Sequence, residues 1–233
     1  MGARGPCRAL VGAGGRVTPR HLPTLLDAHR EALASCRQCG HTDARVRPII
    51  SEARRPRAML VGQAPGKSEL DNRRAFSGRA GRTLFKWLEH AGLNEATFRR
   101  DVYIAAVTRC YPGPSPSGRG DRVPSPAEQA LCAPWLDAEL DLIRPALIIP
   151  VGRLAIDRFL DPEPLDRLVG RVHRLQVRGR QVKVIPLPHP SGASSWINTP
   201  ANRTLLAAAL RHLRIAFADL HRRKRPALAR RSA

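Results

Sequence analysis

Short apolar runs alternate with amphipathic segments along most of the chain. The apolar runs have the length and composition of buried strands, and the predicted strands span residues 57–61, 102–107, 146–151 and 182–186. Apolar residues repeat at helical spacing in the segments around them, which predicts helices at 22–35, 83–91, 125–143, 153–160 and 201–218. This alternation favours a mostly parallel sheet with both faces covered. We therefore expect an α/β fold, a three-layer sandwich with helices flanking the central sheet.

Turn signals place the loops between these elements. Residues 111–126 are dense in proline, glycine and serine, which predicts a long surface loop. The helix that follows opens with Ser125, Pro126 and Glu128, a pattern typical of an N-cap, a first-turn proline and a capping-box glutamate. Ligands of parallel sheets bind at the carboxyl ends of the strands. The loops after residues 61 and 186 both lie at such ends.

The two ends of the chain depart from the central pattern. Residues 1–20 lack the apolar stretch and cleavage site of a secretory signal, and 219–233 are strongly basic. We expect a disordered basic leader at 1–20, one compact domain at 21–218 and a disordered basic tail. No apolar run approaches the roughly 20 residues that span a bilayer. We therefore expect no membrane partner and a cytoplasmic protein, associated with the nucleoid if the source is bacterial.

The net charge is +21, and nearly all of it comes from arginine, because lysine occurs only at positions 67, 86, 183 and 224. The planar guanidinium matches phosphate oxygens, so this charge favours a polyanionic partner. A compositional bias of the genome, with most arginines solvated, is the alternative. The basic tail is either a mobile arm that adds nonspecific affinity or a plain chain end.

Five cysteines stand at positions 7, 36, 39, 110 and 132. Cys36 and Cys39 have a spacing at which two thiolates can face one metal, and Cys110 and Cys132 follow in separate predicted elements beside the sheet. Four thiolates suit zinc or an iron–sulfur cluster. Alternatively, Cys110 and Cys132 are small buried residues, and the first pair is a redox or zinc site of its own.

Several motifs occur together in the order that a known family shows. Residues 61–69 read VGQAPGKSE, 74–81 read RAFSGRAG, 109–112 read RCYP, 131–136 read LCAPWL and 189–191 read HPS. Together they resemble the iron–sulfur uracil-DNA glycosylases known as family 4, from residue 22 to residue 215. The resemblance implies a uracil-DNA glycosylase-like fold and DNA as partner, and we expect a monomer. It also implies that Cys36, Cys39, Cys110 and Cys132 hold a structural 4Fe-4S cluster, with zinc as the alternative.

The resemblance also assigns roles to individual residues. A glycosylase must swing its target base out of the duplex into a pocket, where Phe76 would stack on it. His189 would donate a hydrogen bond to the base as negative charge builds on it, and Ser191 would contact a phosphate. The loop that borders the base and sugar consists of Gly62, Gln63, Ala64, Pro65 and Gly66.

Two positions depart from the family pattern. Gln63 stands where a glutamate is usual, and an amide positions water but cannot act as a base. Ala106 stands where an asparagine usually contacts the base edge, although the position still belongs to the expected substrate site. Glu69 and Asp71 lie in the same loop, and each is either a carboxylate that compensates or a solvated surface charge. We take Gln63, His189 and Asp71 as the catalytic candidates.

These departures leave two alternatives to uracil removal. One is a glycosylase for another lesion, such as hypoxanthine or xanthine, because lost base-edge contacts change discrimination. The other is a catalytically weak protein that binds DNA damage and keeps the fold and cluster. A metal-dependent hydrolase is disfavoured, because the eight histidines are scattered and none forms a helical i, i+4 pair beside a carboxylate.

Overall fold

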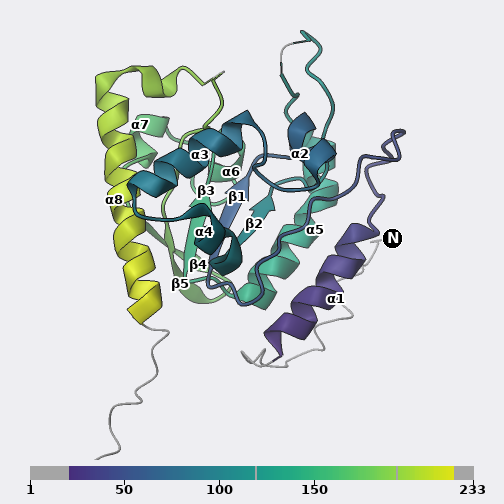
Figure 1. The fold of residues 1–233 in the computed structure, drawn as a ribbon, viewed down its shortest axis with the longest axis horizontal. Helices are drawn as coiled ribbons and strands as arrows, with labels where there is room; N and C mark the ends of the chain where they lie inside the picture. Colours follow the sequence, from purple (N-terminus) through teal and green to yellow (C-terminus); the bar gives the residue numbers. More distant parts are fainter. Residues whose placement is uncertain (1–20, 119, 193, 223–233) are drawn as a thin grey trace, which may run out of the picture.

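A five-stranded sheet forms the centre of the molecule (Figure 1). The computed structural model describes residues 21–118, 120–192 and 194–222. The strands are β1 (Ala58–Gly62), β2 (Val102–Ala106), β3 (Leu147–Pro150), β4 (His173–Val177) and β5 (Arg180–Val184), in the order β2-β1-β3-β5-β4. All neighbours pair in parallel except β4 and β5. The carboxyl ends of β1, β2 and β3 therefore meet at one edge.

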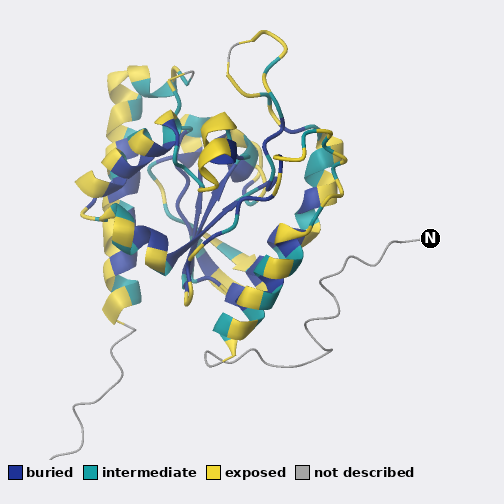
Figure 2. Ribbon diagram, turned by 45° about the vertical axis from the view of Figure 1, so that its right-hand side comes forward, coloured by how far each residue is buried: buried dark blue, intermediate teal, exposed yellow. Residues whose placement is uncertain are grey.

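Helices cover both faces of this sheet. They are α1 (Leu22–Ala34), α2 (Lys67–Asn72), α3 (Arg79–His90), α4 (Glu95–Asp101), α5 (Pro126–Ile143), α6 (Arg153–Ile156), α7 (Leu165–Leu168), the 3-10 helix η2 (Trp196–Asn198) and α8 (Pro200–Arg222). Leu60 of β1 packs in a cluster with residues of α3, α4 and α8. Its neighbours Met59 and Val61 pack in a second cluster with α1, α5 and α6. The three-layer α/β sandwich expected from the sequence is confirmed, with buried strands between partly exposed helices (Figure 2).

The four predicted strands are all present, but one strand and four short helices, α2, α4, α7 and η2, were not predicted. The missed strand, β4, lies at the sheet edge, and its residues alternate between partly buried and exposed positions. It joins β5 through a tight turn in which Arg178 and Gly179 both have positive φ, 50° and 72°, as hairpin turns of two residues require. A half-exposed edge strand lacks the continuous apolar run that revealed the others.

The last helix is longer than expected. It continues to Arg222, so the prediction of a disordered tail from residue 219 is wrong for 219–222. Lys183 of β5 pairs with Asp219 (3.1 Å), and Arg57 donates to the carbonyl oxygen of Leu220 (3.3 Å). These contacts join the final turn to the sheet. The predicted leader and the remainder of the predicted tail lie outside the described residues.

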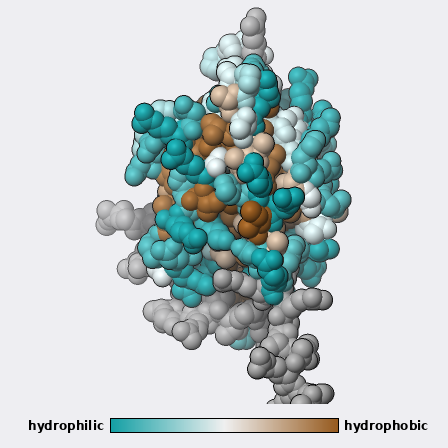
Figure 3. Space-filling model, turned by 90° about the vertical axis from the view of Figure 1, so that its left-hand side faces the viewer, coloured by the Kyte–Doolittle hydropathy of each residue, from teal (hydrophilic) through white to brown (hydrophobic). Residues whose placement is uncertain are grey.

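On the face shown in Figure 3, hydrophobic residues gather at the centre with hydrophilic residues around them. Within the described ranges, no helix has both the length and the apolar character needed to cross a membrane.

Candidate functional site

A cleft of about 500 Å³ opens at the carboxyl ends of β1 and β3. The loop after β1 forms one wall and the loop after β5 contributes another. Of the residues singled out from the sequence, the cleft brings together Gly62, Gln63, Ala64, Pro65, Gly66, Phe76, His189 and Ser191. The parallel topology explains this meeting, because the ends of neighbouring parallel strands share one edge.

Phe76 is held in an unusual backbone conformation beside this cleft. Its φ is 53°, in the left-handed region that non-glycine residues seldom adopt. Arg99 of α4 donates to the carbonyl oxygens of Ala75 (2.8 Å) and Phe76 (3.2 Å), and Glu95 accepts a third hydrogen bond from the same guanidinium (2.7 Å). The buried arginine therefore fixes the backbone on which the phenyl ring is mounted.

Two glycines allow the phenylalanine to sit there. A Cβ at Gly62 would lie 2.9 Å from the ring atom Cζ of Phe76, so the ring covers the end of β1. A Cβ at Gly81 would lie 1.8 Å from the Phe76 carbonyl oxygen, which only an absent side chain permits. The glycines of both motifs thus serve the placement of one aromatic ring.

His189 lies half-buried in the same cleft, with its Nδ1 beside Ser191. The Ser191 backbone N–H donates to His189 Nδ1 (3.2 Å), and the Ser191 hydroxyl oxygen lies 2.8 Å from the same nitrogen. A nitrogen that accepts this hydrogen bond carries no proton, so the neutral ring carries its proton on Nε2. Burial lowers the pKa of His189 below its ordinary value of 6.5. The ring is therefore a neutral N–H donor at neutral pH.

Helix α2 begins directly after the GQAPG loop, residues 62–66. Gly66 is the N-cap of α2, and its backbone N–H donates to the carboxylate of Glu69 (2.9 Å). Glu69 is buried and lines the cleft. Asp71, on the same helix, is exposed and is not among the cleft-lining residues. The structure thus brings Gln63 and His189 into one cleft but leaves Asp71 outside it.

Ala106 borders a smaller space next to the cleft. This pocket of about 40 Å³ lies behind Phe76 and also touches Gly62, Ala64 and Pro65. Ala106 is the last residue of β2 and pairs in register with Gly62. A methyl side chain offers no hydrogen bond, so this wall of the pocket is apolar at the position nearest the sheet.

Sequence reasoning missed one carboxylate of the cleft, Asp121. A Cβ at Gly66 would lie 2.7 Å from its Oδ2 and 2.8 Å from an oxygen of Glu69, so both carboxylates face the same point. Asp121 pairs with Pro114 across the predicted surface loop and accepts a hydrogen bond from Tyr111. Burial, together with the charge of Asp121 and this bond, raises the pKa of Tyr111 to about 12. No feature of the proline-rich sequence indicated that the loop folds back on the GQAPG segment.

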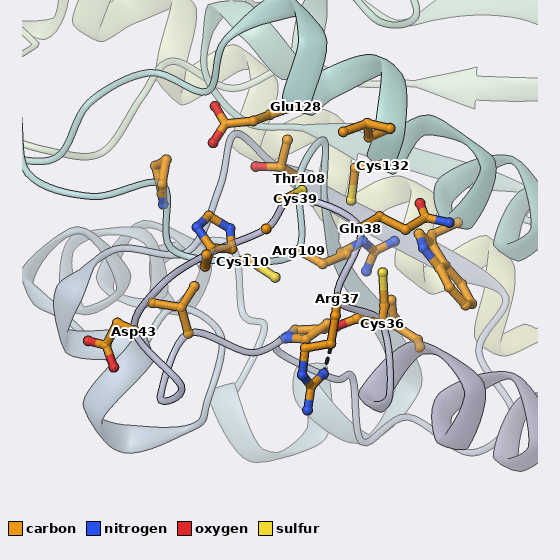
Figure 4. A pocket seen from close by; sticks show the side chains of 18 of the residues that line it. Cys36, Arg37, Gln38, Cys39, Asp43, Thr108, Arg109, Cys110, Glu128 and Cys132 are labelled. Carbon is orange, nitrogen blue, oxygen red and sulfur yellow. Dashed lines mark hydrogen bonds between the residues drawn. The ribbon is translucent and has the colours of Figure 1, made fainter.

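The four candidate metal ligands line a second cavity, of about 360 Å³. Cys36 and Cys39 come from the turn after α1, Cys110 from the segment after β2 and Cys132 from α5, and Figure 4 shows their sulfur atoms around the same space. Burial raises the pKa of Cys110 to about 12 and that of Cys132 to about 11, and neighbouring cysteines add to both shifts. Without a cation these thiols are protonated. In the described part of the chain, no three potential ligands are placed to hold a single metal ion.

Comparison with known proteins agrees with this arrangement. Residues 50–214 match the model of the uracil DNA glycosylase superfamily. The type-4 uracil-DNA glycosylase of Thermotoga maritima is 32% identical over 174 residues, which cover 72% of this chain and 82% of that protein. That of Archaeoglobus fulgidus is 34% identical over 177 residues, covering 73% and 83%. A type-5 uracil-DNA glycosylase of Pyrobaculum aerophilum is 30% identical over 180 residues, covering 70% and 72%. The chain belongs to the uracil-DNA glycosylase superfamily.

Proposed function

We propose that the protein is a DNA-repair enzyme that hydrolyses the N-glycosidic bond of uracil swung out of DNA into the cleft. The observation that carries this proposal is the pairing across one cleft of a fixed aromatic ring, Phe76, with a neutral histidine, His189, whose Nδ1 is occupied by Ser191. A stacked base and an N–H donor at its edge are what glycosidic cleavage of a pyrimidine requires.

The proposed chemistry uses His189 as a hydrogen-bond donor. As the bond from the sugar to the base lengthens, negative charge collects on the base and positive charge on the sugar. Nε2–H of His189 would donate to a uracil carbonyl oxygen, and this donor is already oriented by Ser191 before substrate binds. A donor fixed in advance stabilises the charge of the transition state without reorganisation.

The attacking water would be positioned by Gln63. Its amide can hold a water by hydrogen bonds, but it cannot take the proton that the water loses. Glu69 is engaged with the N-terminus of α2. We therefore propose that Asp121 provides the carboxylate that offsets positive charge on the sugar and receives the proton.

We further propose that the cysteine cavity holds a 4Fe-4S cluster. The fit rests on four thiols from three separate segments that surround one cavity, which suits a group larger than a single ion. When bound, such a cluster would join the turn after α1 to the segment after β2 and to α5. Cys36, Cys39, Cys110 and Cys132 would each give up a proton on binding.

DNA is the proposed partner. Lys67 and Arg79 line the cleft together with Ser191, and cationic side chains at its border suit phosphates on either side of the extruded nucleotide. We propose a monomer that acts in the cytoplasm, at the nucleoid if the source is bacterial.

A panel of lesions tests the proposed activity. Single- and double-stranded oligonucleotides with one uracil, hypoxanthine or xanthine are incubated with the protein, and alkali then reveals abasic sites. We expect release of uracil to exceed that of a His189→Ala variant by at least about a hundredfold. Greater release of hypoxanthine or xanthine would reassign the lesion, because Ala106 cannot read the uracil edge. No release above the His189→Ala variant on any substrate would support a protein that only binds damage.

A further inference from the structure

Arg109 carries a buried charge at the walls of two cavities. Its side chain is 2% exposed, and it lines both the cysteine cavity and the small pocket behind Phe76. In the view of Figure 4 the Arg109 side chain is drawn among the cysteines that line this cavity. The residue directly precedes Cys110, so its backbone is fixed by the segment that supplies one of the thiols.

Among the residues that the structure describes, one nitrogen of this guanidinium has a protein partner. Arg109 Nη2 donates to Glu139 Oε2 on α5. Nε and Nη1 are buried and make no hydrogen bond within the described residues. A charged donor without a partner in a protein interior is strongly destabilising. The unused N–H groups therefore point to a ligand that accepts hydrogen bonds and carries negative charge.

Glu139 keeps the guanidinium in this orientation. The carboxylate is 0% exposed and accepts hydrogen bonds from Tyr103 (2.8 Å) and His29 (3.2 Å) on its other oxygen. These partners belong to β2 and α1, so the network joins three elements around the cysteine cavity. With Nη2 bonded to Glu139, Nε and Nη1 are left without a protein acceptor in the described part of the chain, in a residue that lines the cysteine cavity.

We propose that Arg109 donates hydrogen bonds to the sulfur atoms of the cluster and balances its negative charge. This inference rests on the proposed cluster. Four thiolates bring four negative charges into the cavity, more than the iron and sulfide core compensates. Hydrogen bonds to sulfur and net charge are among the factors that set the reduction potential of such clusters. Arg109 therefore stabilises the cluster-loaded cavity and makes the cluster easier to reduce.

The test is the reduction potential of the cluster in the intact protein, measured by spectroelectrochemical titration. Arg109→Met alone would leave Glu139 buried without its cation, so we pair the changes and compare Arg109→Met/Glu139→Gln with Glu139→Gln. We expect the equilibrium constant for reduction to fall at least tenfold, about 59 mV for one electron. Iron loss to a chelator, followed by absorbance, should be several-fold faster in the double variant.

Arg37→Gln is the matched control. Arg37 borders the same cavity, but it is exposed and donates to the backbone carbonyls of Ala34 (3.0 Å) and Cys36 (2.6 Å). Solvent screens its charge, so its loss should shift the equilibrium constant less than about twofold. Equal shifts in the Arg37 and Arg109 variants, or none in the latter, would overturn the role of Arg109. Iron-free, colourless wild-type protein would instead overturn the proposed cluster, and the inference with it.

Discussion

The phenyl ring of Phe76 lies directly against Gly62, 2.9 Å from the position that a Cβ at residue 62 would occupy. A methyl group there must displace the ring, whose backbone is held in its left-handed conformation by the hydrogen bonds from Arg99. Overpacking of this kind costs about 1 to 3 kcal/mol. We expect Gly62→Ala to lower kcat/KM for uracil release at least about tenfold, since the displaced ring would lose its proposed stacking on the base.

A double-mutant cycle separates this contact from other effects of the methyl group. In a Phe76→Ala background no ring remains to be displaced, so Gly62→Ala should have little further effect on kcat/KM. A tenfold loss in both backgrounds would show that the methyl group acts on something other than Phe76.

The position of the Phe76 ring also depends on Arg99, which holds the backbone that carries it. Its planar fork contacts two backbone carbonyls at once, those of Ala75 and Phe76, whereas a lysine at this position has only one nitrogen. We expect Arg99→Lys to raise KM for a uracil-containing oligonucleotide about fivefold, with a smaller change in kcat, because the proposed stacking of the base on the ring precedes bond cleavage.

The neighbouring Arg100 provides the control for that substitution. It lies on the same helix, is exposed and pairs with Asp101 at the surface (3.2 Å). Arg100→Lys should leave both constants unchanged. If Arg99→Lys lowers the melting temperature but neither constant moves, Arg99 supports α4 and does not position Phe76.

The buried strands could be predicted from the sequence, because a strand covered on both faces consists of a continuous run of apolar residues. Strands such as β1 and β3 are covered on both faces, and they appear as apolar runs at residues 58–62 and 147–150. The edge strand β4 and the short helices α2, α4, α7 and η2 leave no such run. Their positions are set by contacts with distant segments.

In the candidate site, the residues that belong to motifs could be predicted from the sequence, whereas the carboxylates outside the motifs could not. Phe76, His189 and the four cysteines belong to motifs, and the structure places them around two cavities. Asp71 is near Gln63 in sequence, yet α2 carries it to the surface. Asp121 is far from Gln63 in sequence, yet the folded-back loop brings it to the cleft. Distance along the chain was therefore misleading for carboxylates outside the motifs.

The lowered pKa of His189 predicts how stability depends on pH. Burial disfavours the imidazolium in the folded protein, so its pKa there lies below 6.5. Between that value and 6.5 the unfolded chain binds a proton that the folded protein does not. The free energy of unfolding therefore rises with pH through this window. His189→Gln should flatten the rise, measured by urea unfolding between about pH 5 and 8.

The exposed His90 at the end of α3 serves as the comparison for the pH series. His90→Gln should keep the wild-type dependence of unfolding free energy on pH. If the slope survives His189→Gln and disappears in the His90 variant, the burial of His189 does not govern it.

Asp121 is the cleft carboxylate whose removal we expect to slow catalysis. Asp121 faces Gly66 inside the cleft, whereas Asp71 is exposed outside it. Asp121→Asn keeps the shape but removes the charge and the proton acceptor. We expect it to lower kcat at least about tenfold with little change in KM, and Asp71→Asn to have a smaller effect.

Gln63→Glu then tests whether Asp121 compensates for the amide at position 63. If it does, a carboxylate at residue 63 should restore most of the kcat lost in the Asp121→Asn variant, while it improves the wild-type enzyme only slightly. Two carboxylates in one cleft repel each other, so the second adds less than the first. Equal gains in both backgrounds would mean that the two residues act independently. The catalytic charge would then lie elsewhere in the cleft, with Glu69 as the remaining carboxylate that lines it.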